Sequence, residues 1–494
     1  MNANFNLMVK ELKQTKALLL LAGYLLLVFV GFSCQDKSKS TPIRVVEELN
    51  IGESAEVELT NGNKVNLKLL QVDVKRDSIY KAVRSVDVKV SVDGEIVTLQ
   101  SGNYNLPVQV GKVKIDCPAV INYYTNTNQD RWRLEKDARF RLWPKDSPYI
   151  RSENFVYPIK QSWLASLSQS GNEPVHVNHY GSYDGNVIYY HDGHDIGGAE
   201  GLEEIVSATD GVVMPTDGKS VVKIEDERGW HHRYVHLDSV DPAIEAGKKV
   251  KMGQRVGFIG KQGGSGGWVH LHYSIKLKDP SSGEWQIEDA YVYLWESYVR
   301  QYNPDMIAVA RPHKLSCTGQ EVTLNGTKSR SFPGEIVSYE WKYCDGTTAT
   351  GAVQTKTYRK PGTYSEILKV TDSEGNIDYD FQVVLVIDRD QPEKVIPTIQ
   401  PAYYPTLNIQ PGEPVRFFAR TFGTNFGEET WDFGDGTSMV TTQSEFDIKH
   451  ATEGKFAETV HAFSEPGDYI VKVERSNEAG VKAIAHLHVV VQDE

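Results

Sequence analysis

Histidines are concentrated in one part of this chain. Nine of the 14 histidines in the 494-residue sequence fall between His176 and His272. Histidine is the commonest metal ligand and the side chain that most readily changes charge near neutral pH, so this cluster indicates a metal site or proton transfer. Three motifs stand out within it: HDGHD at 191–195, YVHL at 234–237 and HLH at 270–272.

The HLH motif lies in an apolar stretch, 266–275, that predicts a strand. Because strand side chains alternate between faces, His270 and His272 share one face, while Leu271 and Tyr273 share the other. Two imidazoles one strand repeat apart are poorly placed to bind one ion tetrahedrally. They can instead supply one ligand and one neighbour that acts on metal-bound water.

The other two motifs can complete the site. His191 and Asp195 are four residues apart around a bend at Gly193, so both side chains can turn toward one point. Two histidines and a carboxylate form the ligand set of a catalytic zinc site with an open position for water. His236 lies in a strand-like stretch where alternation places Tyr234 on its own face. Each motif alone is more often structural, but the three together, in this order, favour a metal site.

The chain contains its own comparison for the HLH pattern. Residues 485–489, AHLHV, repeat it near the carboxyl end, but no HxxxD motif or further histidine is arranged before them. We therefore interpret this second copy as a terminal strand.

The cluster resembles the lysostaphin-type (LytM-like) zinc metallopeptidases, which cut peptide cross-links in bacterial cell walls. The pattern of that family, H-x-G-x-D-I, Y-x-H-L, G-Q-x-x-G-x-x-G, G-x-x-G and H-L-H, matches residues 191–196, 234–237, 253–260, 263–267 and 270–272. The resemblance implies zinc (Zn2+) as the cofactor, with His191, Asp195 and His272 as its ligands. It also implies that His236 and His270 activate the water and stabilise the oxyanion.

The sequence departs from that family beside the substrate-binding groove that the resemblance implies. Trp268 and Val269 stand where the family often has a proline or a small residue, and the stretch 198–205 is longer than usual. Substrate choice therefore stays open. His179 and Tyr234 are candidates to line the groove. The remaining histidines of the cluster are interpreted as polar loop or strand-edge residues.

Glycines between Gly260 and Gly267 raise the question of a phosphate-binding loop. Such a loop would need Gly-Lys-Ser/Thr at the start of a helix, and here a strand pattern follows instead. We expect these glycines to let the backbone pass close to an extended peptide or adopt a positive φ.

The amino terminus has the pattern of a secretory signal. Three lysines precede an apolar run, 17–32, that ends at Ser33-Cys34. The run is short for a membrane span of about 20 residues. We expect residues 1–34 to be a lipoprotein signal peptide with lipid attached at Cys34, and residues 35–41 to be a linker. An uncleaved membrane anchor is the alternative. Either way the protein is exported and membrane-anchored, at the periplasmic face or the surface of a Gram-negative bacterium.

Composition narrows the remaining possibilities. A net charge of −13 argues against nucleic acid as a partner. Three cysteines besides Cys34 are too few for a dense disulfide framework. Cys117 is expected to be a buried thiol, and the pairing of Cys317 with Cys344 stays open.

The chain is too long for one core, so several domains are expected. Residues 42–153 predict a β-sandwich, with hairpin turns at Asn61-Gly62 and Asp93-Gly94 and an aromatic core. Residues 154–304 hold the LytM-like zinc hydrolase domain, an antiparallel β-sheet. Residues 305–390 and 391–494 echo each other, with a tryptophan and an Asp-Gly turn in each, and resemble PKD domains, which are Ig-like β-sandwiches.

The sequence thus predicts an all-β, multidomain lipoprotein with one metallopeptidase unit. We expect a hydrolase that cleaves peptide cross-links of peptidoglycan, or acts on another extracytoplasmic polymer, with metal-activated water. Two alternatives stay open: a zinc-dependent lyase acting on a uronic-acid glycan through the same groove, and a non-catalytic scaffold that binds the wall or a glycan.

Overall fold

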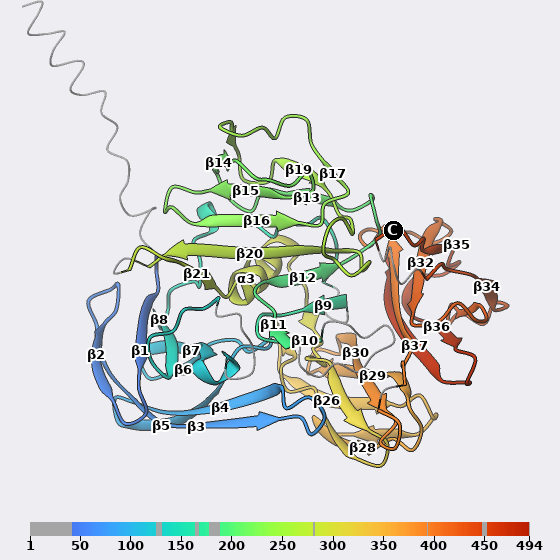
Figure 1. Cartoon of the computed structure of the whole chain (residues 1–494), viewed down its shortest axis with the longest axis horizontal. Helices are drawn as coiled ribbons and strands as arrows, with labels where there is room; N and C mark the ends of the chain where they lie inside the picture. Colours follow the sequence, from blue (N-terminus) through green and yellow to red (C-terminus); the bar gives the residue numbers. More distant parts are fainter. Residues whose placement is uncertain are drawn as a thin grey trace, which may run out of the picture. The chain divides into compact units, whose positions relative to one another are not determined.

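The computed structural model describes residues 42–124, 131–163, 167–176, 188–279, 282–392, 394–446 and 452–493. Cys34, the predicted signal peptide, the linker and His179 lie outside these ranges. Residues 43–494 form one compact unit. Its described part is almost entirely β-structure with one α-helix, α3 (Tyr291–Tyr302), so the all-β expectation is confirmed (Figure 1). No helix within the described ranges is long and apolar enough to cross a membrane.

The first domain is built from two four-stranded antiparallel sheets, with strand orders β1-β8-β7-β6 and β2-β3-β4-β5. Both predicted hairpin turns are present, and Gly62 (φ 82°) and Gly94 (φ 93°) adopt the positive φ that such turns require. The aromatic residues Trp132, Phe140 and Trp143 are all buried, but only Phe140 lies in the core of this domain, as expected. Trp143 packs into the core of the second domain and Trp132 packs with Ile287, so the expected aromatic core is wrong for these two residues. The strands are β1 (Val45–Leu49), β2 (Ser54–Glu58), β3 (Lys64–Arg76), β4 (Val83–Val92), β5 (Glu95–Gln100), β6 (Val108–Val110), β7 (Val113–Val120) and β8 (Ala138–Pro144), with 3-10 helices η1 (Ile121–Tyr124) and η2 (Ser152–Asn154).

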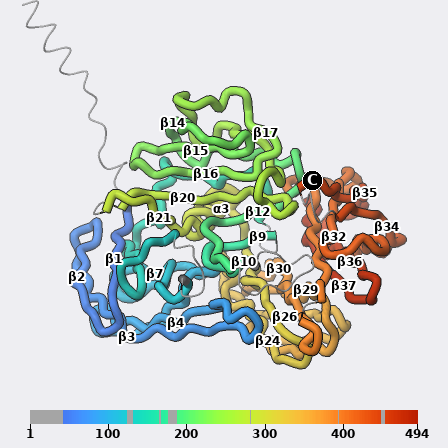
Figure 2. Tube along the Cα trace, viewed as in Figure 1, coloured from blue at the N-terminus to red at the C-terminus, as the bar shows by residue number. Residues whose placement is uncertain are grey.

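The second domain is organised around one antiparallel sheet with strand order β18-β14-β15-β16-β20-β12-β9, and β21 pairs with the far end of β20 (Figures 1 and 2). A small sheet, β13-β19-β17, and the hairpin β10-β11 accompany it. The strands are β9 (Ser168–Gln169), β10 (Pro174–His176), β11 (Ile188–Tyr190), β12 (His194–Gly197), β13 (Glu204–Val206), β14 (Gly211–Met214), β15 (Val222–Glu225), β16 (His231–Val235), β17 (Ser239–Val240), β18 (Lys249–Val250), β19 (Arg255–Phe258), β20 (His270–Lys278) and β21 (Trp285–Glu288).

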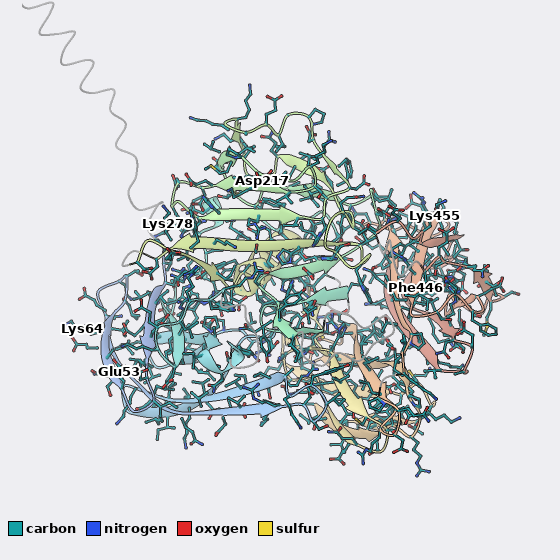
Figure 3. The ribbon with its side chains drawn as sticks, viewed as in Figure 1. Glu53, Lys64, Asp217, Lys278, Phe446 and Lys455 are labelled. Atoms are coloured by element: carbon teal, nitrogen blue, oxygen red, sulfur yellow. The ribbon has the colours of Figure 1, made fainter. Side chains whose placement is uncertain are left out.

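The two faces of strand β20 have different surroundings, one in the hydrophobic core and one polar. Leu271 and Tyr273 are fully buried in the same core as Leu294 of α3. His270 and His272 lie on the opposite face, so the predicted alternation is confirmed. Lys278 closes the strand at its other end (Figure 3).

Two β-sandwiches complete the chain and share a sheet. Strands β29 and β37 pair in parallel, with Gly362 opposite Lys482, which joins the two sandwiches into one nine-stranded sheet. The first contains β22 (Met306–Ile307), β23 (Lys314–Cys317), β24 (Glu321–Asn325), β25 (Arg330–Ser331), β26 (Ile336–Lys342), β27 (Thr348–Thr350), β28 (Val353–Thr357), β29 (Gly362–Asp372) and β30 (Ile377–Ile387). The second contains β31 (Thr398–Tyr404), β32 (Val415–Phe422), β33 (Glu429–Asp432), β34 (Val440–Thr442), β35 (Ala457–His461), β36 (Gly467–Ser476) and β37 (Lys482–Val491).

The repeated motifs of the two sandwiches have the expected places. Trp341 and Trp431 are buried in their respective cores. Gly434 has a positive φ of 78°, which Cys344 at the equivalent position does not share, so the two turns differ. Cys317 and Cys344 are both free thiols.

The second HLH motif lies on β37, as predicted for a terminal strand. His488 bonds two carboxylates: Nε2 lies 2.6 Å from Asp468 and Nδ1 lies 3.3 Å from Asp378. The two aspartates come from different sandwiches, so this histidine joins the two domains.

Candidate metal centre

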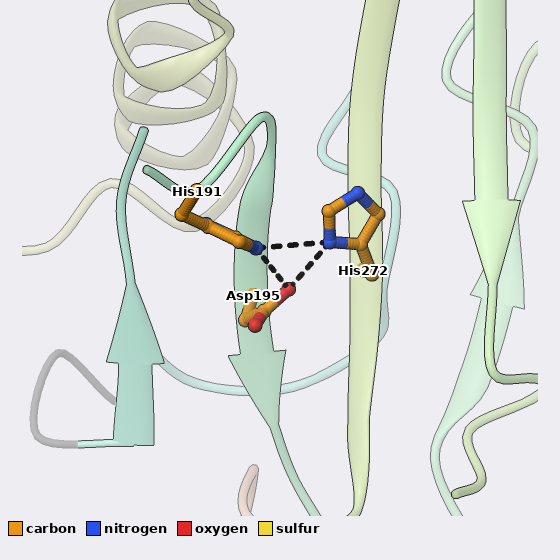
Figure 4. A group of neighbouring side chains, drawn as sticks. All are labelled: His191, Asp195 and His272. Atoms are coloured by element: carbon orange, nitrogen blue, oxygen red, sulfur yellow. Dashed lines mark hydrogen bonds and ion pairs between the residues drawn. The ribbon is translucent and has the colours of Figure 1, made fainter. Parts of the chain in front are cut away.

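Three side chains converge at the edge of the main sheet. Oδ1 of Asp195 lies 3.1 Å from Nε2 of His191 and 2.9 Å from Nδ1 of His272, and the two ring nitrogens are 3.0 Å apart (Figure 4). These three atoms form a group that can hold a metal ion. The structure therefore brings together the three residues for which the resemblance implied a ligand role.

Strand pairing and one bend produce this convergence. Asp195 on β12 is directly opposite His272 on β20, and facing residues in antiparallel strands have Cβ atoms about 5 Å apart. His191 precedes β12, and the bend of the chain at Gly193 brings the side chain of His191 to the same point. A Cβ atom at residue 193 would lie 2.7 Å from Cε1 of His272, so only glycine leaves room for the ring.

The backbone fixes which nitrogen of His191 faces the ligand group. Nδ1 of His191 lies 3.2 Å from the carbonyl oxygen of Ser170. Because a carbonyl only accepts, Nδ1 carries a hydrogen and Nε2 faces the site. Burial lowers the pKa of His191, but the neighbouring Asp195 outweighs burial and raises this pKa to about 9, so binding of a cation would displace the proton from Nε2. The pairwise distances are close to the separation of about 3.3 Å expected for zinc ligands at tetrahedral positions. The donor set therefore fits a zinc ion.

The carboxylate of Asp195 is held in its charged form. Burial alone would raise its pKa, but the neighbouring His191, together with the hydrogen bonds from His191 and His272, holds the pKa of Asp195 well below its ordinary value. An ionised carboxylate between two imidazoles is an electrostatically favourable place for a cation.

Two further histidines lie beside this group. The rings of His236 and His270 have their centroids 4.7 Å apart, and Nε2 of His270 lies 3.5 Å from Oδ2 of Asp195. Nδ1 of His236 donates to the carbonyl oxygen of Gln262 at 2.7 Å, and Nδ1 of His270 donates to that of Trp268 at 3.1 Å. Each bond leaves Nε2 as the proton-accepting nitrogen.

Burial keeps this pair neutral. It lowers the pKa of His236 to about 4, and the nearby His270 acts in the same direction. Burial also lowers the pKa of His270. Both imidazoles are therefore unprotonated at neutral pH, which is the form that a general base must have.

The prediction that Tyr234 lines the groove is wrong. Its side chain is fully buried in the core, where its hydroxyl accepts a hydrogen bond from the amide of Ala208 at 2.7 Å. Strand alternation would place His236 on that same core face. However, β16 ends at Val235 and His236 has a positive φ of 68°, which turns its ring toward His270 instead.

Two further histidines of the cluster, His194 and His232, are buried among side chains outside the metal group. His194 is buried against Tyr104 and Tyr291, so the interpretation of His194 as a polar loop or strand-edge residue is wrong. The same interpretation is wrong for His232, which is fully buried between Asp226 and the hydroxyl of Tyr273 on a strand that is paired on both sides. The candidate His179 lies outside the described residues.

Asp192 supports the site but was not among the residues predicted from the sequence. Its Oδ1 lies 3.6 Å from Nε2 of His272, on the far side of the ring from the ligand group, and its Oδ2 accepts a 2.8 Å bond from Arg131 of the first domain. A carboxylate behind a metal-binding histidine orients the ring and increases its basicity. Its position directly after His191 was the available signal.

Profiles of known families match three parts of the chain. The peptidase family M23 profile matches residues 189–282, and PKD domain profiles match residues 303–386 and 402–491. A collagenase, ColA, from Clostridium perfringens is 33% identical over 99 residues, which span 20% of this chain and 9% of the collagenase. The chain thus matches only a small part of that relative's length.

Two solved structures are also similar to parts of the chain. A protein named as a glycyl-glycine endopeptidase LytM from Ruminococcus gnavus is 27% identical, with a TM-score of 0.20, and the match covers 29% of this chain and 61% of that one. The catalytic domain of a prophage-encoded M23 protein, EnpA, from Enterococcus faecalis is 25% identical, with a TM-score of 0.18, covering 25% of this chain and 95% of that one.

The site and the matched profile define a domain of the metallopeptidase class. More specifically, the chain carries an M23 (LytM-type) peptidase domain followed by two PKD domains.

Proposed function

We propose that this protein is an exported zinc metalloendopeptidase that hydrolyses peptide cross-links of peptidoglycan. The observation that carries the proposal is the convergence of five side chains. Three of them present ligand atoms about 3 Å apart. The other two, His236 and His270, are neutral imidazoles whose Nε2 atoms are free to accept a proton.

The chemistry is divided between the two groups of residues. A zinc ion bound by His191, Asp195 and His272 supplies a Lewis acid that polarises the scissile carbonyl and activates water. His236 or His270 accepts the proton of the attacking water at Nε2. The ring that gains this proton becomes an Nε2–H donor, which can stabilise the negative charge on the carbonyl oxygen and later protonate the leaving amine.

The substrate is tested with two polymers. Incubation of the protein with cell-wall sacculi should release new free amino groups, and the Asp195→Ala variant should release none. Release of unsaturated sugar ends from an acidic polysaccharide would instead support the lyase, and the absence of either product would support a binding scaffold.

The membrane anchor belongs to the same proposal and rests on sequence. Lipid attachment at Cys34 would hold the peptidase domain at the envelope, near a wall substrate. Metabolic labelling with a fatty acid should label the full-length protein in a bacterial host, and Cys34→Ala should remove the label. A labelled Cys34→Ala protein would exclude this attachment site.

A further inference from the structure

The two residues that depart from the M23 pattern, Trp268 and Val269, contact the second PKD domain. The indole of Trp268 stacks on Phe422 with a centroid distance of 4.6 Å and an angle of 7° between the rings. Phe422 is 1% exposed and ends strand β32. A large side chain next to the HLH motif thus has a packing partner outside the peptidase domain.

The backbone of the same segment is held by polar side chains of that PKD domain. The amide of Gln400 forms two bonds with Val269: Oε1 accepts from its N–H at 2.9 Å, and Nε2 donates to its carbonyl at 2.8 Å. Arg420 donates from Nη1 to the carbonyl of Gly267 at 3.1 Å. Gln400 and Arg420 are 4% and 0% exposed, so these bonds are buried.

These PKD residues lie together on one ladder. Gln400 pairs with Arg420, and Thr398 pairs with Phe422, in the antiparallel strands β31 and β32. Residues two apart on a strand share a face, so one face of this ladder binds three consecutive residues, Gly267, Trp268 and Val269.

The bound segment controls His270. The carbonyl of Trp268 accepts the Nδ1–H of His270, and the backbone N–H of His270 donates to Gly260 at 3.0 Å. The peptide group that selects the tautomer of His270 is thus placed directly between the contacts made by Phe422 and Gln400.

We propose that the second PKD domain helps to position a catalytic residue of the peptidase site. In this proposal Gln400 is a positioning residue that orients His270 through Val269 and the Trp268 carbonyl. This inference rests on the proposed peptidase function only for its effect on turnover. Gln400 touches no ligand atom of the metal group, so its loss should leave the metal bound.

The test is the variant Gln400→Met in the full chain. Methionine keeps the length of the side chain and removes both bonds, which leaves the Val269 peptide groups unpaired. We expect kcat to fall about 10-fold with KM nearly unchanged, because small misplacements of catalytic groups cost rate. The zinc content should stay at the wild-type value.

Two measurements do not depend on turnover. Hydrogen exchange of the peptide that spans residues 267–270 should become faster in Gln400→Met. The 15N resonances of His270, assigned by their loss in His270→Gln, should change from the Nδ1–H tautomer to a mixture. If the wild-type protein cleaves no peptide, the proposed function fails, while these two measurements still decide the positioning role.

Gln382 provides the matched control. It is 1% exposed in the first PKD domain and donates to the carbonyl of Pro312 at 2.8 Å. Gln382→Met should change neither exchange at 267–270 nor kcat. Trp268→Leu, which removes the stack from the peptidase side, should act in the same direction as Gln400→Met. Wild-type exchange at 267–270 in Gln400→Met, an unaltered His270 tautomer, or loss of zinc together with kcat would overturn the proposal.

Discussion

Gly193 lies directly against the imidazole of His272. A Cβ atom built on Gly193 would stand 2.7 Å from Cε1 and 2.8 Å from Nε2 of that ring, and 2.8 Å from the backbone carbonyl oxygen of Tyr273. Even a methyl group at residue 193 would therefore occupy space that the ring of His272, one of the three candidate metal ligands, now fills.

Gly193→Ala should displace His272 and lower metal affinity at least 10-fold while the domain stays folded. Zinc content after dialysis against a chelator and circular dichroism measure the two effects. Gly264→Ala is the control, because a Cβ there meets no atom within 4 Å. Full zinc retention in Gly193→Ala would contradict this steric account.

His272 and His270 should respond differently to removal. His272→Ala removes one of three ligand atoms and should abolish zinc retention, whereas His270→Ala should keep the metal and lose turnover by about 100-fold or more. Metal analysis of the purified variants, together with peptide cleavage, separates the two roles. Equal zinc loss in both variants would overturn this division.

Asp192 should increase the affinity of the site for the metal without binding the metal itself. Asp192→Asn removes the charge behind His272 and should weaken metal binding about 10- to 100-fold. Competition with a chromophoric chelator measures the change. The same substitution at the exposed Asp217 should have no effect, and equal affinities in the two variants would exclude the supporting role.

Glu288 should make the protein sensitive to acid. It accepts bonds from Arg44 at 2.7 Å and from Arg141 at 3.0 Å, which join the first domain to the peptidase domain. Burial opposes its ionisation, but the two guanidinium groups lower the pKa of Glu288 to about 2. A depressed pKa stabilises the folded state above the ordinary pKa of about 4.3, and this stabilisation is lost as the pH falls toward 2.

Glu288→Gln should therefore lower the free energy of unfolding by about 3 kcal/mol at pH 7. The difference from the wild type should shrink as the pH falls from about 4 toward 2. Urea unfolding followed at several pH values measures both effects. A difference that does not depend on pH would show that the charge of Glu288 is not responsible.

His488 should have the opposite dependence on pH. Burial lowers its pKa, but bonds to Asp378 and Asp468 outweigh burial and raise the pKa of His488 to about 9. Its stabilising effect is complete below the ordinary pKa of about 6.5 and is lost as the pH rises through 9. His488→Gln should be less stable than the wild type by about 3 kcal/mol at pH 6 and approach it above pH 9.

His486, two residues earlier on the same strand, provides the comparison. Burial lowers the pKa of His486 to about 4, so the neutral ring stabilises the fold above about pH 6.5 and this effect is lost as the pH falls through 4. His486→Gln and His488→Gln should thus show opposite trends in thermal unfolding between pH 4 and 9. Parallel trends would refute the assignment for His488.

Sequence patterns were sufficient where a short-range rule decides the structure. The Asn61-Gly62 and Asp93-Gly94 turns follow from the backbone preferences of those residues, and the opposite faces of His270 and Leu271 follow from strand alternation. The same rule failed at Tyr234 and His236, because the positive φ at His236 ends the alternation. Nothing in the local sequence announces that conformation for a histidine.

The sequence by itself determined which residues carry the chemistry: the HxxxD motif at 191–195 and the HLH motif at 270–272, which supply imidazoles and a carboxylate at workable spacings. Only the tertiary structure decided how they meet, with Asp195 opposite His272 across two strands, Asp192 behind His272, and Gln400 bonded to Val269. The physical reason is the range of the interactions. Spacing and turn preferences act over a few residues, whereas these contacts join segments up to 131 residues apart and exist only when the sheets and domains pack.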